Sequence, residues 1–291
     1  MKRTVFRNYD QAELDRQYDQ RAWAPNAIEL INRYGVDSAA VRQRTGEPDT
    51  YDYGDTRAES LDLFRAHRTP APIHVFIHGG AWRMLSARDS AFAAETFVRA
   101  GAHFVALDFA NVLETGGDLM PMAEQVRRAI AWVWRNAGEF GGDPQRLYVT
   151  SQSSGAHLAA CALTTDWKRE FGLPADVVKG ALCASGMYDL KPVRLSARSA
   201  YVRFTDAMEE ALSPQRHLQS IRCPVVVAYG TLETPEFQRQ ARDFVSALKK
   251  SNKKVELIAG EGYNHFELAE TLASPYGVLG SAALELLGLA G

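Results

Sequence analysis

The sequence contains few of the features that mark secreted, membrane or metal-binding proteins. Its three cysteines, Cys161, Cys183 and Cys223, are far apart and lie in apolar segments, which is typical of buried free thiols and not of a disulfide framework or a zinc site. No stretch is long and apolar enough to cross a bilayer, and the charged N-terminus lacks the apolar segment of a signal peptide. We therefore predict a cytoplasmic protein with no metal site and no membrane partner.

An excess of charge of either sign is also missing. The 291 residues include 33 lysines and arginines and 35 aspartates and glutamates, so the formal net charge is only −2. Such a chain offers no electrostatic footprint for nucleic acid. Hydrophobic residues make up 46% of the chain, which is enough for the core of one large α/β domain over residues 1–291. The expected partner is a small-molecule substrate, and a homo-oligomer is left open.

Strands and helices alternate along most of the chain. Strands are expected at Ile73–Ile77, Phe104–Phe109, Leu147–Thr150, Val178–Cys183, Val225–Tyr229 and Lys254–Ile258. Helices are expected at Ala87–Ala100, Pro121–Ala137, Gly155–Thr165, Pro235–Lys249 and Pro275–Leu287. This alternation predicts an α/β fold, a mostly parallel sheet with helices on both faces and ligands at the carboxyl ends of its strands.

Two segments lie outside this alternation. Residues 1–55 are polar and form an expected N-terminal extension with helices at Asn26–Arg33 and Ser38–Arg44, and Tyr18, Trp23 or Tyr34 could reach the mouth of a pocket. The stretch Ser60–Arg65 alternates like an antiparallel or edge strand. Residues 187–221 interrupt two core strands and are the expected cap over the site.

A strand and a helix meet at a sharp turn around Ser153. The apolar strand ends at Thr150, small polar residues follow, and good helix formers resume at Ala156. On such a turn the hydroxyl of Ser153 projects from the end of the sheet, as in a nucleophile elbow. Ser151 takes the place of the first glycine of the usual Gly-x-Ser-x-Gly pattern, and serine is small enough to fit. The alternative interpretation is an ordinary turn with a helix-capping serine.

Two adjacent glycines, Gly79 and Gly80, follow the strand that ends at Ile77. Paired glycines leave backbone amides unshielded and adopt conformations that are closed to other residues. With the amide of Ser154 at the start of the following helix, their amides would form an oxyanion hole. The alternative is that the pair only makes a tight turn.

Candidate partners of Ser153 follow two later strands. Glu233 and His265 each come shortly after a predicted strand, and the order serine, acid, histidine is that of α/β-hydrolase triads. His265 would accept the serine proton, and Glu233 would hold its imidazole in one tautomer. Glu236 is the alternative acid, but it follows a proline and is expected to open a helix, where a carboxylate suits the helix dipole.

The other histidines have structural interpretations. His157 lies one turn into the helix after Ser153 and is expected to bond to backbone or to a neighbouring loop. His78 is expected to support the loop of Gly79 and Gly80 through a side-chain hydrogen bond. No matching partner is evident for His67, His74, His103 and His217.

Several segments together resemble the kynurenine formamidase (arylformamidase) branch of the α/β-hydrolases. They are Tyr18–Trp23, Tyr53–Asp55, Leu61–Leu63, His78–Trp82, Phe140–Pro144, Ser153–Leu158 and Asn264–Phe266. The resemblance implies an α/β-hydrolase fold and hydrolysis of N-formylkynurenine to kynurenine and formate, in tryptophan catabolism, without a metal or organic cofactor. Three residues depart from the branch: Ala81 where an aromatic residue often stands, Gln152 where histidine is usual, and Ser154 where alanine is common.

Aromatic residues near the predicted strand ends are candidates for the walls of the pocket. The tentative substrate-binding residues are Trp82, Phe109, Tyr188 and Phe266, with Met187 and Tyr201 as further candidates, and any of them could instead belong to the core. The expected cap contains Arg194, Arg198 and Arg203. These arginines could form a solvated helix face, or one of them could pair with a substrate carboxylate.

Together these patterns predict a serine hydrolase that cleaves a small aryl amide or ester through an acyl-enzyme. Arylformamidase is the leading activity, and a carboxylesterase or amidase acting on another small aromatic substrate is the alternative. A binding module without chemistry is a more distant alternative. Such a module would have no need for Ser153, Glu233, His265 and the paired glycines together.

Overall fold

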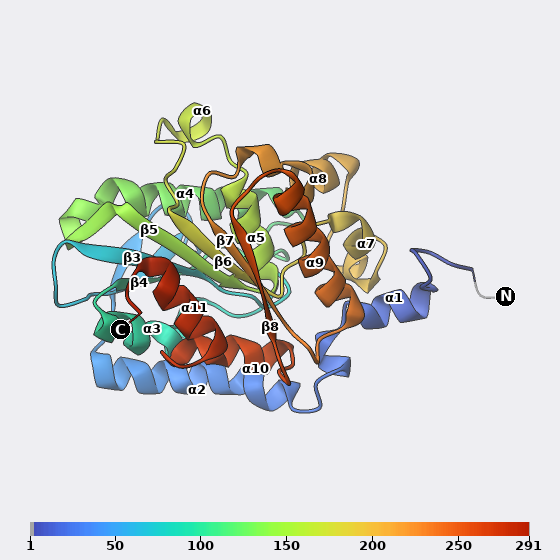
Figure 1. Ribbon diagram of the computed structural model, residues 1–291, viewed down its shortest axis with the longest axis horizontal. Coiled ribbons are helices and arrows are strands. Elements are labelled where there is room, and N and C mark those ends of the chain that lie inside the picture. The colour runs from blue at the N-terminus through green and yellow to red at the C-terminus, as the bar shows by residue number, and fades with distance from the viewer. Residues whose placement is uncertain (1–2, 291) are drawn as a thin grey trace.

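The computed structural model describes residues 3–290, whose central feature is one twisted sheet of eight strands in the order β1-β2-β4-β3-β5-β6-β7-β8 (Figure 1). From β4 to β8 neighbouring strands are parallel, whereas β1 and β2 add an antiparallel edge. The predicted, mostly parallel sheet is therefore confirmed. The strands are β1 (Asp49–Asp52), β2 (Ser60–Phe64), β3 (Ala71–Ile77), β4 (His103–Leu107), β5 (Gly142–Gln152), β6 (Gly180–Ala184), β7 (Val225–Gly230) and β8 (Val255–Gly260).

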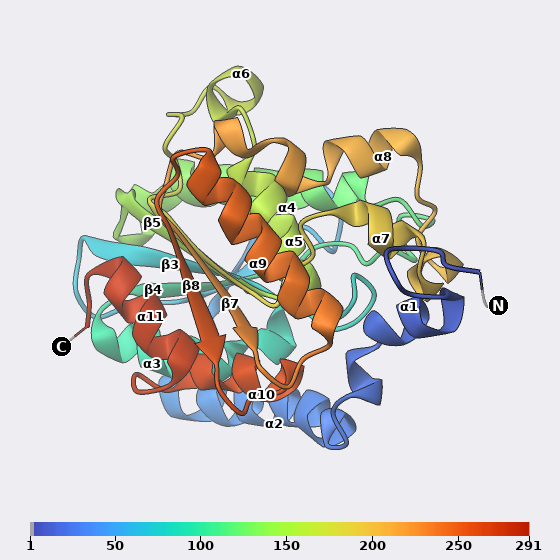
Figure 2. The same ribbon diagram turned by 45° about the vertical axis from the view of Figure 1, so that its right-hand side comes forward.

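Helices cover both faces of the sheet, as the alternation predicts (Figures 1 and 2). One face packs against α4 (Met120–Asn136), α5 (Ser154–Leu163) and α9 (Pro235–Lys250). The other packs against α3 (Ala94–Ala100) and α11 (Val278–Leu287), with α10 (His265–Glu270) at its edge. Every residue of β3 is buried, with Ile73, Val75 and Ile77 in one core and Phe76 in the other. Burial on both faces explains its continuous apolar run.

Helix α2 (Ala27–Thr45) corrects the prediction of two separate helices in the extension. It continues through Gly35, although glycine inside a helix costs about 1 kcal/mol relative to alanine. A Cβ at Gly35 would lie 3.3 Å from Asp89 Oδ1. The missing side chain therefore allows α2 to pack closely on the 3₁₀ turns of Ala87–Ala93, which replace the first half of the helix predicted at Ala87–Ala100.

The elements that the sequence patterns did not predict are short. A helix of one or two turns is too short to show a clear apolar period. The elements in this group are β1, α1 (Gln11–Gln17), α6 (Trp167–Phe171), α7 (Leu190–Arg194), α8 (Asp206–Ala211) and α10. Helix α11 also begins at Val278, three residues later than predicted.

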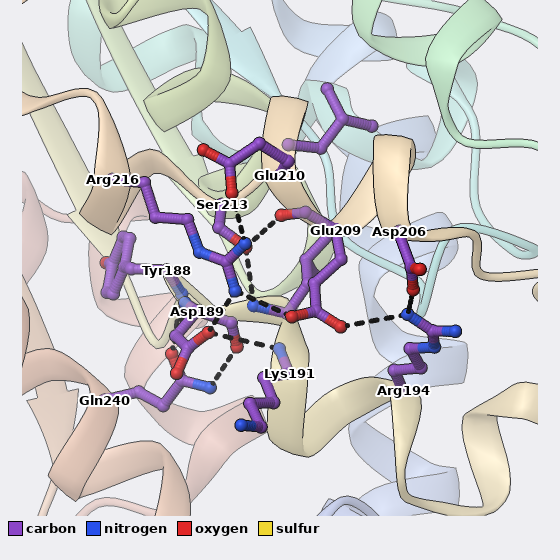
Figure 3. A network of polar contacts seen from close by, with 12 residues as sticks. Tyr188, Asp189, Lys191, Arg194, Asp206, Glu209, Glu210, Ser213, Arg216 and Gln240 are labelled. Carbon is purple, nitrogen blue, oxygen red and sulfur yellow. Dashed lines mark hydrogen bonds and ion pairs between the residues drawn. The ribbon is translucent and has the colours of Figure 1, made fainter.

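The segment between β6 and β7 carries α7 and α8, is here called the α7–α8 segment, and is held together by ion pairs. Arg216 pairs with Glu209 and Glu210, and Arg194 pairs with Asp206 and Glu209 (Figure 3). Both arginines are partly exposed to solvent, so each pair contributes at most about 1 kcal/mol. The limits of a cap at residues 187–221 remain a prediction.

A buried glutamine attaches this segment to the main body. Gln240 of α9 accepts hydrogen bonds of 2.8 Å from the amides of Tyr188 and Asp189, and its own amide donates to the Asp189 carbonyl (Figure 3). Because buried amides without partners are costly, this contact fixes where the chain leaves β6.

The N-terminal segment packs on the start of α9. Gln17 Oε1 accepts from the amide of Glu236 at 3.0 Å, and Gln20 Nε2 donates to Thr234 Oγ1 at 3.2 Å. Tyr18 donates its hydroxyl to Glu236 at 3.0 Å. Residues near the N-terminus are thereby held beside the loop that follows β7. The single-domain organisation of the whole chain remains a prediction.

Gly155 in the first turn of α5 lies against the end of β3. A Cβ on Gly155 would lie 2.2 Å from the carbonyl oxygen of Ile77 and 2.3 Å from that of His78. Real Cβ atoms do not approach backbone this closely, so only glycine permits the helix to cross the strand here.

We expect Gly155→Ala to lower the free energy of unfolding by about 1–3 kcal/mol, the usual cost of overpacking. Urea unfolding followed by circular dichroism measures it. The matched control is Gly138→Ala, because a Cβ at exposed Gly138 meets no atom within 4 Å. Equal unfolding midpoints for the two variants would contradict the close packing of α5 on β3.

Candidate active site

Ser153 stands at the turn between β5 and α5 in a strained backbone conformation. Its φ of 57° and ψ of −124° lie in a region that non-glycine residues rarely adopt, at a cost of roughly 1–3 kcal/mol. Its amide donates to the Ala184 carbonyl at 2.9 Å, which ties the turn to the end of β6. This geometry is that of a nucleophile elbow, with the side chain directed out of the sheet.

Three side chains that are far apart in sequence meet beyond the strand ends. His265 Nε2 lies 2.9 Å from Ser153 Oγ, and His265 Nδ1 lies 3.1 Å from Glu233 Oε2. Because a carboxylate can only accept, Nδ1 carries the proton and Nε2 is free to accept the serine hydroxyl. His265 opens α10 directly after Asn264, whose side chain caps that helix together with Glu267. The capped helix end therefore fixes the imidazole.

Glu233 is a buried carboxylate whose two oxygens are both used. Besides His265 at Oε2, its Oε1 accepts from Ser185 Oγ at 2.5 Å and from the Gly230 amide at 2.7 Å. Its side chain has no exposed surface. Burying an ion without such donors would be very costly. The loops after β6 and β7 thus join in holding one acid.

Ser185 is a residue that the sequence analysis missed. It follows β6 directly, is fully buried, and has a positive φ of 56°. The available signal was its place after a strand, the same place that Ser153 and Glu233 take after theirs.

Glu236, the alternative acid, lies in a different network. It stands in the first turn of α9, as expected, and pairs with Arg239 as well as with Tyr18. The structure therefore brings Glu233, and not Glu236, against the histidine.

The glycine loop after β3 follows an unusual backbone path. Gly80 has a φ of 101°, and Ala81 and Trp82 also have positive φ values. A Cβ on Gly80 would lie 2.0 Å from the Met84 carbonyl oxygen, so this position requires glycine. Gly80 and Ala81 line the pocket around Ser153, whereas Gly79 packs behind it against Gln152 and Ser153. An oxyanion hole of Gly79, Gly80 and Ser154 amides remains a prediction.

Helix α5 holds this loop through Trp82. Ser154 Oγ accepts from the Trp82 amide at 3.1 Å, and His157 Nδ1 accepts from the indole N–H at 3.2 Å. His157 Nε2 in turn donates to the Leu212 carbonyl at 2.8 Å. Burial lowers the pKa of His157 to about 4, so the ring stays neutral at physiological pH and Nδ1 remains an acceptor. His157 is thus placed as the structural interpretation expected.

His78 supports the same loop from the other side. Its Nδ1 donates to the Gly79 carbonyl at 2.9 Å, and its ring stacks on Phe109 with centroids 4.4 Å apart. These contacts agree with the expected supporting hydrogen bond.

The pocket in front of Ser153 has a volume of about 280 Å³. Aromatic residues from distant segments line it, among them Tyr18 and Tyr34 from the N-terminal extension, Tyr201 from the α7–α8 segment, and Phe266. Tyr18 and Tyr34 therefore reach the pocket as anticipated, but Trp23 does not.

Three of the four tentative substrate-binding residues lie outside the lining of this pocket. Trp82 is buried beneath the loop, Phe109 stacks on His78, and Tyr188 stacks on Phe244 with centroids 4.1 Å apart while its hydroxyl donates to the Cys183 carbonyl. None of the three lines the pocket. An aromatic residue after a strand can turn inward as well as outward, and these three complete the core. Met187 is also fully buried.

Two further features concern residues 3–290 as a whole. No group of three or more His, Cys, Asp or Glu side chains there is arranged to hold a metal ion. None of the helices formed by these residues has the length and apolar character to span a membrane.

We expect Ser185→Ala to lower kcat for p-nitrophenyl acetate about tenfold with a small change in KM, because it removes one donor from the buried carboxylate that orients His265. Steady-state kinetics measures it. Ser151→Ala is the control, since that hydroxyl donates to the neutral Leu182 carbonyl at 3.1 Å. If both variants lost the same activity, Ser185 would have no special role in positioning the acid.

Comparisons with known proteins agree with this geometry. Residues 61–258 match the model of the BD-FAE family. The chain is 29% identical to a kynurenine formamidase of Danio rerio and 30% identical to one of Salmo salar, in each case over 97% of this chain and 98% of the relative. A crystal structure of a putative thioesterase from silicibacter sp. tm1040 superimposes with a TM-score of 0.80 at 22% identity, over 92% of this chain and 98% of that chain.

The structural likeness shows the α/β-hydrolase fold, and the sequence matches extend it to a family of hydrolases. The family model spans more than half of this chain, and the match to the Salmo salar enzyme runs nearly from end to end of both chains. This protein is therefore a serine hydrolase of the α/β-hydrolase fold that belongs to the BD-FAE family and to the family of the kynurenine formamidases.

Proposed function

We propose that this protein is an arylformamidase that hydrolyses N-formylkynurenine to kynurenine and formate. The observation that carries the proposal is the hydrogen-bonded series from Ser153 through His265 to Glu233, open to a pocket of about 280 Å³ with aromatic walls. The full-length similarity to two kynurenine formamidases supports the choice of substrate.

The reaction begins with proton transfer from Ser153 to His265. The serine oxygen then attacks the formyl carbon, and the negative charge that develops on the formyl oxygen is stabilised by backbone amides of the glycine loop and of Ser154. Glu233 stabilises the imidazolium that forms. When the C–N bond breaks, His265 returns the proton to the leaving arylamine.

A water molecule completes the cycle. His265 removes a proton from the water, which attacks the formyl ester on Ser153, and formate leaves as the serine regains its proton. Because the formyl group is the smallest acyl group, the acyl side of the site needs little space. The aromatic walls formed by Tyr18, Tyr201 and Phe266 suit the aryl ketone of the leaving amine.

Cleavage of another small aromatic ester or amide is the second candidate. The observation in its favour is Ala81, which lines the pocket and leaves more room beside the glycine loop than an aromatic residue would.

The direct test is the rate of N-formyl-L-kynurenine hydrolysis by the purified protein, followed by the absorbance of kynurenine, with p-nitrophenyl acetate for comparison. We expect kcat/KM for the formamide above about 10⁴ M⁻¹s⁻¹, the lower end of ordinary enzyme efficiency. Ester turnover with negligible formamide turnover would overturn the arylformamidase assignment and favour the second candidate.

Variants at the proposed site test the mechanism separately from the substrate. We expect Ser153→Ala and His265→Ala each to lower kcat at least about 10³-fold while the circular dichroism spectrum and the melting temperature stay near those of the unmodified protein. Near-normal turnover by either folded variant would show that the reaction does not use that residue.

A further inference from the structure

Two arginines from different parts of the chain flank Tyr201 in the pocket. Arg198 donates from Nη1 to the Tyr201 hydroxyl at 2.9 Å, and the guanidinium of Arg83 lies 4.4 Å from the centroid of the Tyr201 ring. Arg83 belongs to the loop that follows the paired glycines, and Arg198 belongs to the segment between α7 and α8. All three residues line the same pocket as Ser153.

Arg198 is a buried cation with only neutral partners. Its relative exposure is 8%, and besides Tyr201 it donates to the Tyr18 carbonyl at 3.1 Å. Its Nε is buried without a hydrogen-bond partner, and its guanidinium lies 5.4 Å from the Trp82 ring. A buried charge without a counterion is costly, which makes this arginine unusual unless an anion joins it.

The acids that line the pocket are already used. Asp15 accepts from the Gln11 side chain and from the Ala197 amide, and Asp19 forms an ion pair with Arg21. Across residues 3–290, neither Arg83 nor Arg198 is within ion-pair distance of a carboxylate.

Other arginines of the same region differ from these two. Arg194 and Arg216 in the α7–α8 segment have carboxylate partners (Figure 3). Arg239 of α9 pairs with Asp243. Arg203 is exposed on the surface and does not line the pocket. Arg83 and Arg198 therefore differ from the three paired arginines in having no carboxylate partner among residues 3–290.

We propose that Arg83 and Arg198 form an anion subsite that binds a carboxylate of the substrate. The planar guanidinium offers paired donors that match a carboxylate, and Arg198 is held in place by Tyr18 and Tyr201 before the ligand arrives. Half-buried Arg83 closes the subsite from the glycine loop. This inference deepens the proposed function and rests on it: the substrate is an aryl amide or ester that also carries an acid group.

The test compares two non-hydrolysable ligands of similar size as competitive inhibitors of p-nitrophenyl acetate hydrolysis. 3-Benzoylpropionate has an aryl ketone and a carboxylate, whereas butyrophenone has the ketone and no charge. We expect Arg83→Gln to weaken inhibition by the acid about tenfold or more relative to inhibition by the ketone, as loss of a charged hydrogen bond does. Arg88→Gln, at an exposed arginine outside the pocket, should keep the original ratio of the two inhibition constants.

A second variant covers the buried arginine. Arg198→Lys keeps the charge but loses the planar fork, so we expect it to lose part of the preference for the acid. An unchanged ratio of inhibition constants in folded Arg83→Gln and Arg198→Lys would overturn the subsite.

The outcome for the subsite can be separated from that for the formamidase. A lost preference for the acid in a protein that does not cleave N-formyl-L-kynurenine would keep the anion subsite and reject the formamidase. Formamide turnover, combined with an unchanged ratio of the two inhibition constants in both variants, would keep the formamidase and reject the anion subsite.

Discussion

The proposed site depends on the hydrogen bonds that the buried carboxylate of Glu233 accepts. It accepts hydrogen bonds from the loop after β6 through Ser185, from the end of β7 through the Gly230 amide, and from α10 through His265. Since a buried ion requires all its partners, the three segments must stay in register for the charge to be tolerated. The same contacts leave Nε2 of His265 facing Ser153. The hydrogen bonds that hold these loops together therefore also orient His265 as the base.

Helix α5 organises the other half of the site. Its start follows the strained Ser153, its first glycine crosses β3 closely, and its Ser154 and His157 hold Trp82 from the same side. The position of the glycine loop is thus set by the element that carries the proposed nucleophile. Preorganisation of this kind lets amides stabilise developing charge without rearranging during the reaction. Through the Leu212 carbonyl, His157 also links this half to the α7–α8 segment.

Much of this arrangement could be predicted from the sequence because parallel strands end at one edge. Ser153, Glu233, His265 and the paired glycines each follow a strand, so the topology alone brings them near one another. Glu233 could be preferred to Glu236 because helix-start chemistry is local. Trp82, Phe109 and Tyr188 are buried and do not line the pocket, since the direction of an aromatic side chain after a strand depends on contacts with distant helices.

The residues that were missed share that dependence on distant contacts. Ser185 acts on an acid 48 positions later in the chain, and the subsite combines Arg83 with Arg198 across even more of the sequence. The close approach of Asp89 to Gly35 of α2 likewise joins residues that are far apart in the sequence. Local patterns cannot report such pairs, because what selects them is packing between elements.

The central claim is that Ser153 is a nucleophile activated by His265 and Glu233. The most direct measurement is the rate of labelling by a fluorophosphonate, with the modified residue located by mass spectrometry of the digested protein. The account predicts one adduct, on Ser153, formed rapidly by the unmodified protein and much more slowly by His265→Ala and Glu233→Gln. An unlabelled Ser153 in the folded protein, or an adduct on another serine, would contradict it.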